Sequence, residues 1–153
     1  MKYTETTNPP ARKNFEYKNQ DFGDFFAPDK IGQYSSKIKS ITDNILNSDG
    51  IVLIYSQFID GGAVPMALAL ESIGFTRFGT KVSNLFKTPP HKPIDAKTFL
   101  PKDEMENPDD FKPATYTMIT GEKALSPDKV FDLKNLTDED NNITEIESIE
   151  YDE

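Results

Sequence analysis

Apolar residues recur at helical spacing in one short segment of the chain. Within residues 35–48 they fall three and four positions apart, at Ile38, Ile41, Ile45 and Leu46, which is the period of one helix face. Ser35 or Ser36 can cap the start of this helix, because a serine hydroxyl accepts a hydrogen bond from a free N–H of the first turn. Asp49 and Gly50 then favour a turn that ends it.

An uninterrupted apolar run follows, with the sequence IVLIY at residues 51–55. Such a run of β-branched and aliphatic residues predicts a strand that is buried on both faces, as in a parallel sheet. Residues 63–73 then predict a helix, with Pro65 in its first turn, where proline is tolerated. Gly74 comes next, and glycine is favoured there because it adopts the left-handed conformation without strain.

A second strand pattern occupies residues 115–120, with the sequence TYTMIT, and Gly121 ends it. The sequence SPD at residues 126–128 combines a capping hydroxyl, a first-turn proline and an acid, so it predicts a helix over about 127–136. This alternation of helices and strands predicts an α/β fold, with a short parallel sheet flanked by helices.

Two segments do not follow this alternation. Residues 1–30 predict an extended arm, because prolines and a glycine discourage helix there. The arm's aromatic residues either pack, onto the body or onto a missing neighbour, or stack on nucleic-acid bases, and packing is the simpler expectation. They are Phe15, Tyr17, Phe22, Phe25 and Phe26. Residues 76–113 hold six of the chain's eleven prolines, which predicts a functional or a disordered insertion. The body of the chain is then 31–136, followed by an acidic tail at 137–153.

Charge is concentrated in that tail. The chain of 153 residues has a formal net charge of −9, and residues 137–153 hold eight acids and no base. The rest of the chain is therefore nearly neutral, and it could bind a polyanion only through a local patch. Hydrophobic residues make up 36% of the chain, which predicts a modest core.

Composition also excludes several classes of protein. The chain has no cysteine, so it contains no disulfide scaffold, thiolate zinc site or cysteine nucleophile. A single histidine, His91, excludes any site that needs two. No apolar run approaches the roughly 20 residues that span a bilayer. We therefore expect a soluble intracellular protein with no membrane contact.

Two motif-like segments fail on inspection. Residues 74–81, GFTRFGTK, have the glycine spacing of a phosphate-binding P-loop, but they reverse the Lys-Ser/Thr order and follow a predicted helix instead of a strand. Residues 138–142, DEDNN, lack the glycine and the glutamate that a calcium loop requires downstream. No metal site and no catalytic residue is predicted.

The order of elements resembles the opening of the second RecA-like lobe of superfamily 2 helicases. In Swi/Snf-type members a Ser-Lys start leads into a helix, and a buried strand then ends in a Ser-Gln-aromatic motif, matched here by YSQF at residues 55–58. The next helix closes at a Gly-aromatic pair, matched by GF at residues 74–75. The proline-rich insertion is similar to that in helicases of nucleocytoplasmic large DNA viruses, which are related to the poxvirus early transcription factor helicases. The resemblance covers roughly residues 31–136.

The resemblance implies a partial motor lobe whose strand ends face nucleic acid. Ser56 and Gln57 would donate hydrogen bonds to phosphate oxygens. Thr120 and Gly121 would end the second strand on the same side, where a backbone N–H could also reach a phosphate. The alternative is that Ser56 and Gln57 only satisfy loop backbone groups, and that Gly121 only makes the turn.

The resemblance also implies ATP and Mg²⁺ for the complete helicase, but no position here matches its ATP-binding lysine or the arginine-rich helix of its motif VI. We therefore expect a fragment of a helicase C-terminal lobe that contacts nucleic acid weakly, binds no cofactor alone and is inactive alone. Its partner would be the missing lobe or a transcription-complex protein, in the host cytoplasm, viral factory or virion.

The alternative function is a non-catalytic protein-interaction module derived from a helicase lobe. The sequence leaves open whether the nucleic acid is DNA or RNA, and whether the C-terminus is genuine or the product of a frameshift. It also leaves open the role of the 76–113 insertion and the oligomeric state.

Overall fold

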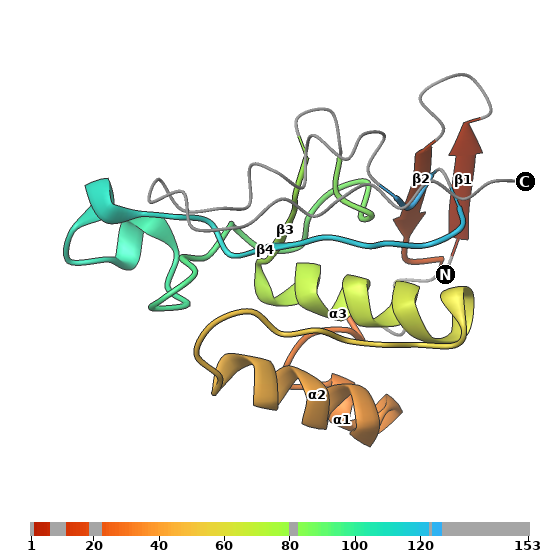
Figure 1. Ribbon diagram of the computed structural model, residues 1–153, viewed down its shortest axis with the longest axis horizontal. Coiled ribbons are helices and arrows are strands. Elements are labelled where there is room, and N and C mark those ends of the chain that lie inside the picture. Colours follow the sequence, from red (N-terminus) through yellow and green to blue (C-terminus); the bar gives the residue numbers. More distant parts are fainter. Residues whose placement is uncertain (1, 7–11, 19–22, 80–82, 123, 127–153) are drawn as a thin grey trace, which may run out of the picture.

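The computed structural model describes residues 2–6, 12–18, 23–79, 83–122 and 124–126 (Figure 1). Two antiparallel strands open the chain, β1 (Lys2–Thr6) and β2 (Arg12–Glu16). A short helix, α1 (Ile31–Tyr34), and two longer helices, α2 (Ser36–Leu46) and α3 (Val64–Ile73), lead to a pair of short parallel strands, β3 (Thr76–Arg77) and β4 (Thr115–Tyr116). The described part is therefore mixed α/β, as the sequence predicts. The predicted helix over 127–136 and the acidic tail lie outside the described residues.

Helix α2 (Ser36–Leu46) confirms the first predicted helix. Ser35 is its N-cap, and its hydroxyl accepts a hydrogen bond from the backbone N–H of Ile38 at 3.2 Å. The apolar stripe packs against the core through Ile38, Ile41, Ile45 and Leu46. Capping and helical spacing are local properties, so the sequence was sufficient to predict this helix.

Helix α3 (Val64–Ile73) forms the centre of the core. A single π-helical turn, η2 (Ile59–Ala63), precedes it, and Pro65 lies in its first turn as predicted. Gly74 ends the helix with φ of +119°. A Cβ there would lie 2.7 Å from the carbonyl oxygen of Lys92, so the position requires glycine for space as well as for conformation.

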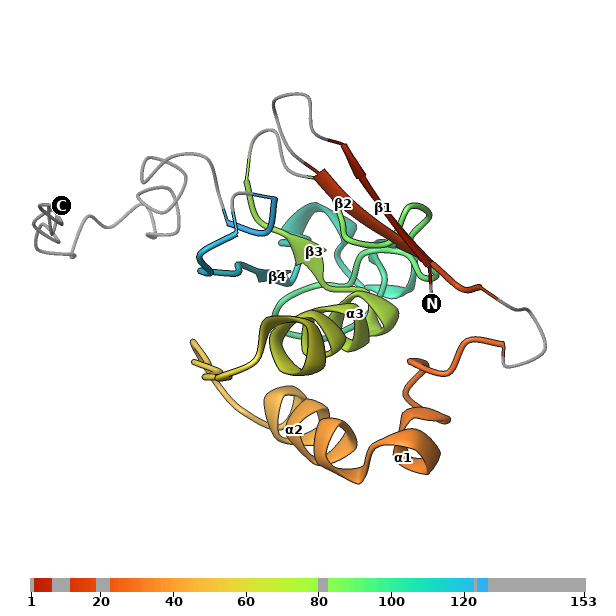
Figure 2. The same cartoon turned by 90° about the vertical axis from the view of Figure 1, so that its right-hand side faces the viewer.

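The predicted buried strand at 51–55 is wrong in the described structure. These residues form no β-ladder, and their exposed fractions are 99, 44, 92, 38 and 87% in chain order. The segment runs along the outside of α2 and α3 (Figures 1 and 2), and Val52 and Ile54 are less exposed than their neighbours. An apolar run favours a buried strand only where neighbouring strands and a second covering layer exist, and the described residues supply neither.

The parallel sheet is instead very short. It pairs β3 (Thr76–Arg77) with β4 (Thr115–Tyr116), so only the first two residues of the predicted strand at 115–120 form a ladder. Helices α2 and α3 lie on one side of this sheet (Figures 1 and 2). The mixed α/β class is established, whereas the larger sheet of a RecA-like lobe is not formed by the described residues.

The aromatic residues of the N-terminal arm pack onto the body. Phe15 and Phe26 are buried in the core, and Tyr17 and Phe25 pack against it. The backbone of Phe15 also hydrogen-bonds with Leu85 at 2.7 Å and with Lys87 at 3.0 Å. The packing interpretation is thus confirmed for these four aromatic residues, and Phe22 lies outside the described residues.

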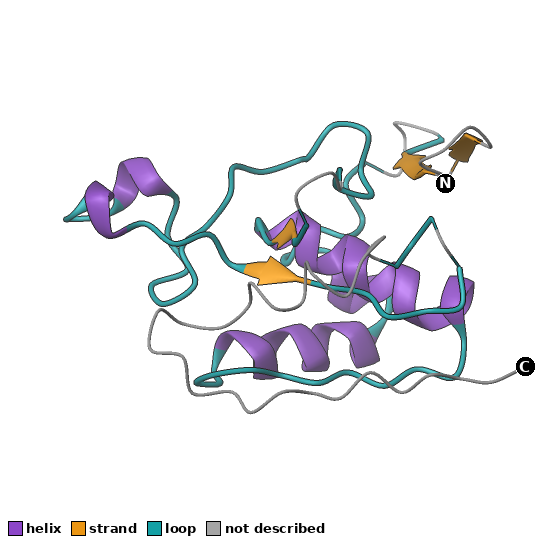
Figure 3. Cartoon of the chain, turned by 45° about the horizontal axis from the view of Figure 1, so that its top comes forward, coloured by secondary structure: helices purple, strands orange, loops and turns teal. Residues whose placement is uncertain are grey.

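The described part of the 76–113 insertion is folded onto the core. Leu85, Phe86 and Ile94 are buried, which excludes the disordered interpretation for this part. Two 3₁₀ turns, η3 (Lys102–Glu104) and η4 (Pro108–Asp110), lie at one extremity of the molecule, away from α2 (Figures 1 and 3). The prolines therefore mark an irregular but packed segment.

Candidate functional site

Ser56 and Gln57 follow the exposed apolar segment. The Ser56 hydroxyl donates to the carbonyl oxygen of Phe58 at 2.8 Å and accepts from the Phe58 N–H at 3.3 Å. Gly62 lies so close that a Cβ there would be 2.0 Å from the Ser56 oxygen. The hydroxyl is thus engaged by the local turn, whereas the Gln57 side chain is exposed and makes no hydrogen bond within the described residues.

Thr120 and Gly121 lie in a tight loop after β4. The Thr120 backbone N–H donates to the Ser126 hydroxyl at 2.9 Å, and the Thr120 hydroxyl accepts from the Glu122 N–H at 3.1 Å. Gly121 is exposed, and a Cβ added there would meet nothing within 4 Å. The side chain of Thr120 therefore organises the loop, and Gly121 leaves its backbone open to solvent.

Both segments lie at the same end of the molecule. Residues 51–58 and 117–122 reach the end where α3 begins, the first below α3 and the second above it in Figure 1, and Figure 2 places them on the same side. Asp60 and Glu122 belong to or adjoin these segments and are acidic, and the Arg77 guanidinium already donates to the carbonyl oxygens of Ala124 and Leu125. A phosphate here would depend on short polar donors and backbone N–H groups instead of basic side chains, so we expect weak binding.

A buried acid joins α3 to the insertion and to β4. The Glu71 carboxylate accepts hydrogen bonds from the N–H groups of Leu85 at 2.7 Å and Phe86 at 2.8 Å, and from the Tyr116 hydroxyl at 2.6 Å. Burial raises the pKa of Glu71, and these hydrogen bonds oppose that rise. Burial also raises the pKa of Tyr116, as does the neighbouring Glu71. The Glu71 carboxylate has a structural role, because both of its oxygens accept hydrogen bonds from donors of the same chain.

A second acid organises the outer part of the insertion. One oxygen of Asp95 accepts from the backbone N–H groups of Lys97 at 3.0 Å and Thr98 at 2.9 Å. The other accepts from the N–H of Lys112 at 2.9 Å. These bonds hold the pKa of Asp95 well below its usual range. Neither acid was predicted from the sequence. The signal for Glu71 was an acid within an otherwise apolar helix pattern, whereas Asp95 lies in a segment that also contains lysines and carries no such signal.

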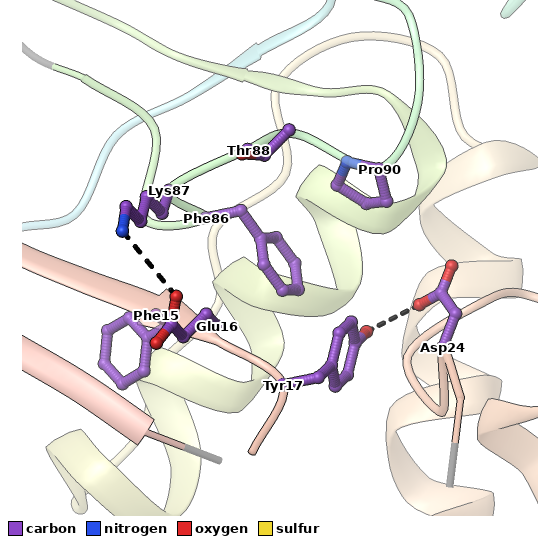
Figure 4. Close-up of a pocket in the computed structure, with 8 residues that line it drawn as sticks. All are labelled: Phe15, Glu16, Tyr17, Asp24, Phe86, Lys87, Thr88 and Pro90. Atoms are coloured by element: carbon purple, nitrogen blue, oxygen red, sulfur yellow. Dashed lines mark hydrogen bonds and ion pairs between the residues drawn. The ribbon is translucent and has the colours of Figure 1, made fainter. Parts of the chain in front are cut away.

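A cavity of about 270 Å³ lies between the arm and the insertion (Figure 4). The aromatic side chains of Phe15, Tyr17 and Phe86 line it, with the Asp24 carboxylate at one end. The Tyr17 hydroxyl donates to Asp24 at 2.5 Å. Burial raises the pKa of Tyr17, and the hydrogen bond to Asp24 raises it further. Lys87 and Glu16, whose charged groups lie 3.8 Å apart, also line the cavity, and none of the four predicted site residues does.

The groups around Asp24 do not form a catalytic triad. The Ser72 hydroxyl donates to Asp24 at 3.4 Å, but Ser72 is fully buried and cannot meet a substrate. The imidazole of His91 lies 3.9 Å from the other Asp24 oxygen, and its side chain is half exposed. The cavity therefore combines a hydrogen-bond acceptor, the Asp24 carboxylate, with aromatic side chains, and Ser72 is not accessible as a nucleophile.

Metal-ligand clusters, a P-loop and membrane-spanning helices are not found among the described residues. Within the ranges that the structure describes, no group of three His, Cys, Asp or Glu side chains could hold a metal ion. The described part of the glycine-containing segment, residues 74–79, does not form a P-loop, because Gly74 ends a helix and β3 follows it. Among the described helices, none has both the length and the apolar character to cross a bilayer.

Comparisons with known proteins add no relative. No protein-family model, no curated protein and no solved structure matches the chain.

Proposed function

We propose that this chain is part of the C-terminal RecA-like lobe of a superfamily 2 helicase of the large-DNA-virus type, and that it contributes contacts to a nucleic-acid backbone. The observation that carries the proposal is the exposed extended segment 51–55, which leads directly into Ser56 and Gln57. A central strand without its neighbouring strands would have this exposure. The segments that hold these residues and Thr120-Gly121, residues 51–58 and 117–122, also reach the same end of the molecule (Figures 1 and 2).

Contact with phosphate would fall mainly on Gln57 and on the backbone at Gly121. Both are exposed, whereas the hydroxyls of Ser56 and Thr120 already bond to neighbouring backbone groups. ATP and Mg²⁺ belong to the complete helicase in this proposal. The described residues do not fit either group, since they form neither a P-loop nor a cluster of metal ligands. Hydrolysis is therefore not assigned to this chain.

The test is equilibrium binding of the full chain to fluorescently labelled single-stranded DNA and RNA, followed by fluorescence anisotropy. We expect dissociation constants on the order of 10⁻⁴ M at physiological salt, without base preference, and weaker binding as salt rises. Gln57→Ala should lose about 1 kcal/mol of binding free energy, roughly a fivefold change. Gln33→Ala, which removes another exposed glutamine, is the matched control. An affinity that does not change with salt concentration, or an equal loss of binding free energy in both variants, would contradict the proposal.

A second candidate function is a protein-interaction module without catalytic activity. The exposed apolar face of residues 51–58 favours it, because soluble proteins rarely leave a large contiguous apolar patch uncovered unless it meets a partner. The two candidates differ in their ligand. If the chain binds another protein and shows no salt-dependent affinity for nucleic acid, the result would support the interaction-module function.

A further inference from the structure

One short segment carries most of the exposed apolar surface. Six of the nine exposed large hydrophobic side chains in the described part of the chain fall within residues 51–58. We call the four most exposed of them the outer strip: Ile51 at 99%, Leu53 at 92%, Tyr55 at 87% and Phe58 at 67%. A strip of this kind is the signature of an interaction surface.

The backbone of the same segment is also open. Among the described residues, no backbone hydrogen bond involves residues 51–55. An extended segment with unpaired N–H and C=O groups is a template for pairing with another strand. Its composition strengthens this tendency, because it has high β-propensity and contains no charge, proline or glycine. The segment therefore offers both side chains and backbone to an added strand.

We propose that residues 51–55 pair antiparallel with the same residues of a second copy of this chain, about a two-fold axis at Leu53. The occupant of this surface must be extended, apolar and uncharged. A second copy supplies such a strand from the same patch, so the interface closes on itself. The inference deepens the interaction-module function and does not depend on the nucleic-acid contacts.

Charge selects the antiparallel arrangement. With Leu53 opposite its own copy, Ile51 lies opposite Tyr55, and Asp49 lies opposite the uncharged Gln57. Parallel pairing in register would instead place Asp49 opposite Asp49, and like charges directly opposite each other destabilise a strand pair. The antiparallel register also brings cross-strand apolar side chains to Cβ separations of about 5 Å. Ile51, Leu53 and Tyr55 of the two copies would thereby pack side by side on one face of the paired strands.

The first experiment is sedimentation equilibrium of the full chain over a range of concentrations. The wild-type chain should associate to a dimer. Leu53→Lys, which places two ammonium groups opposite each other at the axis, should weaken association at least about tenfold. Ile119→Lys is the matched control, because it changes an exposed apolar residue outside the strip, and it should leave association unchanged. Circular dichroism would verify that both variants fold like the wild type.

The second experiment tests the register by disulfide crosslinking. The chain has no cysteine, so a single introduced thiol can only crosslink between copies. Leu53→Cys should crosslink readily under mild oxidation, because the two thiols face each other across the axis. Ile51→Cys should crosslink poorly, because its two copies would be about 14 Å apart along the strands, beyond the reach of a disulfide.

Each opposite result would overturn the inference. A monomer at every concentration would exclude the pairing, and equal loss of association in the two lysine variants would place the interface elsewhere. Equal crosslinking at positions 51 and 53 would indicate parallel strands in register. An open series of larger species in place of a dimer would exclude the closed two-fold interface.

Discussion

Replacement of Glu71 by alanine tests the link between α3 and the insertion. Glu71 is 1% exposed, and its carboxylate serves three donors, the N–H groups of Leu85 and Phe86 and the hydroxyl of Tyr116. A buried donor left without an acceptor costs about 1–3 kcal/mol. Glu71→Ala leaves all three donors without an acceptor. It also removes the desolvation cost of a buried carboxylate, which offsets part of that loss. The expected net loss is about 3–5 kcal/mol in the free energy of unfolding.

That loss is large relative to the stability of a small protein, which is typically about 5–15 kcal/mol. Glu71→Gln retains one acceptor oxygen and turns an amide N–H₂ toward the remaining donors, so it should cost less, about 1–3 kcal/mol. Urea unfolding followed by circular dichroism measures both values. Hydrogen exchange at the amides of Leu85 and Phe86 reports the local effect, because their exchange should accelerate in both variants.

The matched control is Glu106→Ala, which removes an exposed acid from the same insertion. It should change the free energy of unfolding by less than about 0.5 kcal/mol. A loss below about 1 kcal/mol for Glu71→Ala, or unchanged exchange at Leu85 and Phe86, would refute the reasoning. Either result would mean that the three hydrogen bonds do not hold the insertion on α3.

Three further changes follow from local geometry. Asp95 has a folded-state pKa below its unfolded value, so its stabilisation is present above the unfolded pKa and is lost as pH falls toward the folded one. Asp95→Asn should be less stable at neutral pH and should flatten that acid dependence in urea titrations at stepped pH. Gly74→Ala should cost roughly 2 kcal/mol or more by thermal unfolding, because of its positive φ and the Lys92 carbonyl, whereas Gly121→Ala should be near neutral. Ser35→Ala should remove about 1 kcal/mol in urea unfolding through loss of the α2 cap, and Ser40→Ala, on the exposed face of the same helix, should not.

Local sequence signals were enough to predict the two main helices. The cap at Ser35, the spacing of the α2 stripe, Pro65 and Gly74 all act within a few residues of the position they specify. Propensity, capping and the left-handed glycine are properties of the short segment itself. Their physics does not depend on distant parts of the chain, so the structure places α2 and α3 where the sequence predicts them.

The exposure of residues 51–55 was decided by tertiary structure alone. An apolar run indicates what a segment prefers to contact, and not whether strands and a covering layer are present to provide those contacts. The insertion shows the same dependence, because Glu71 holds it through bonds that span 14 and 15 residues to Leu85 and Phe86. Such bonds carry no periodic signal in the sequence, since they form only after the chain has folded back on itself.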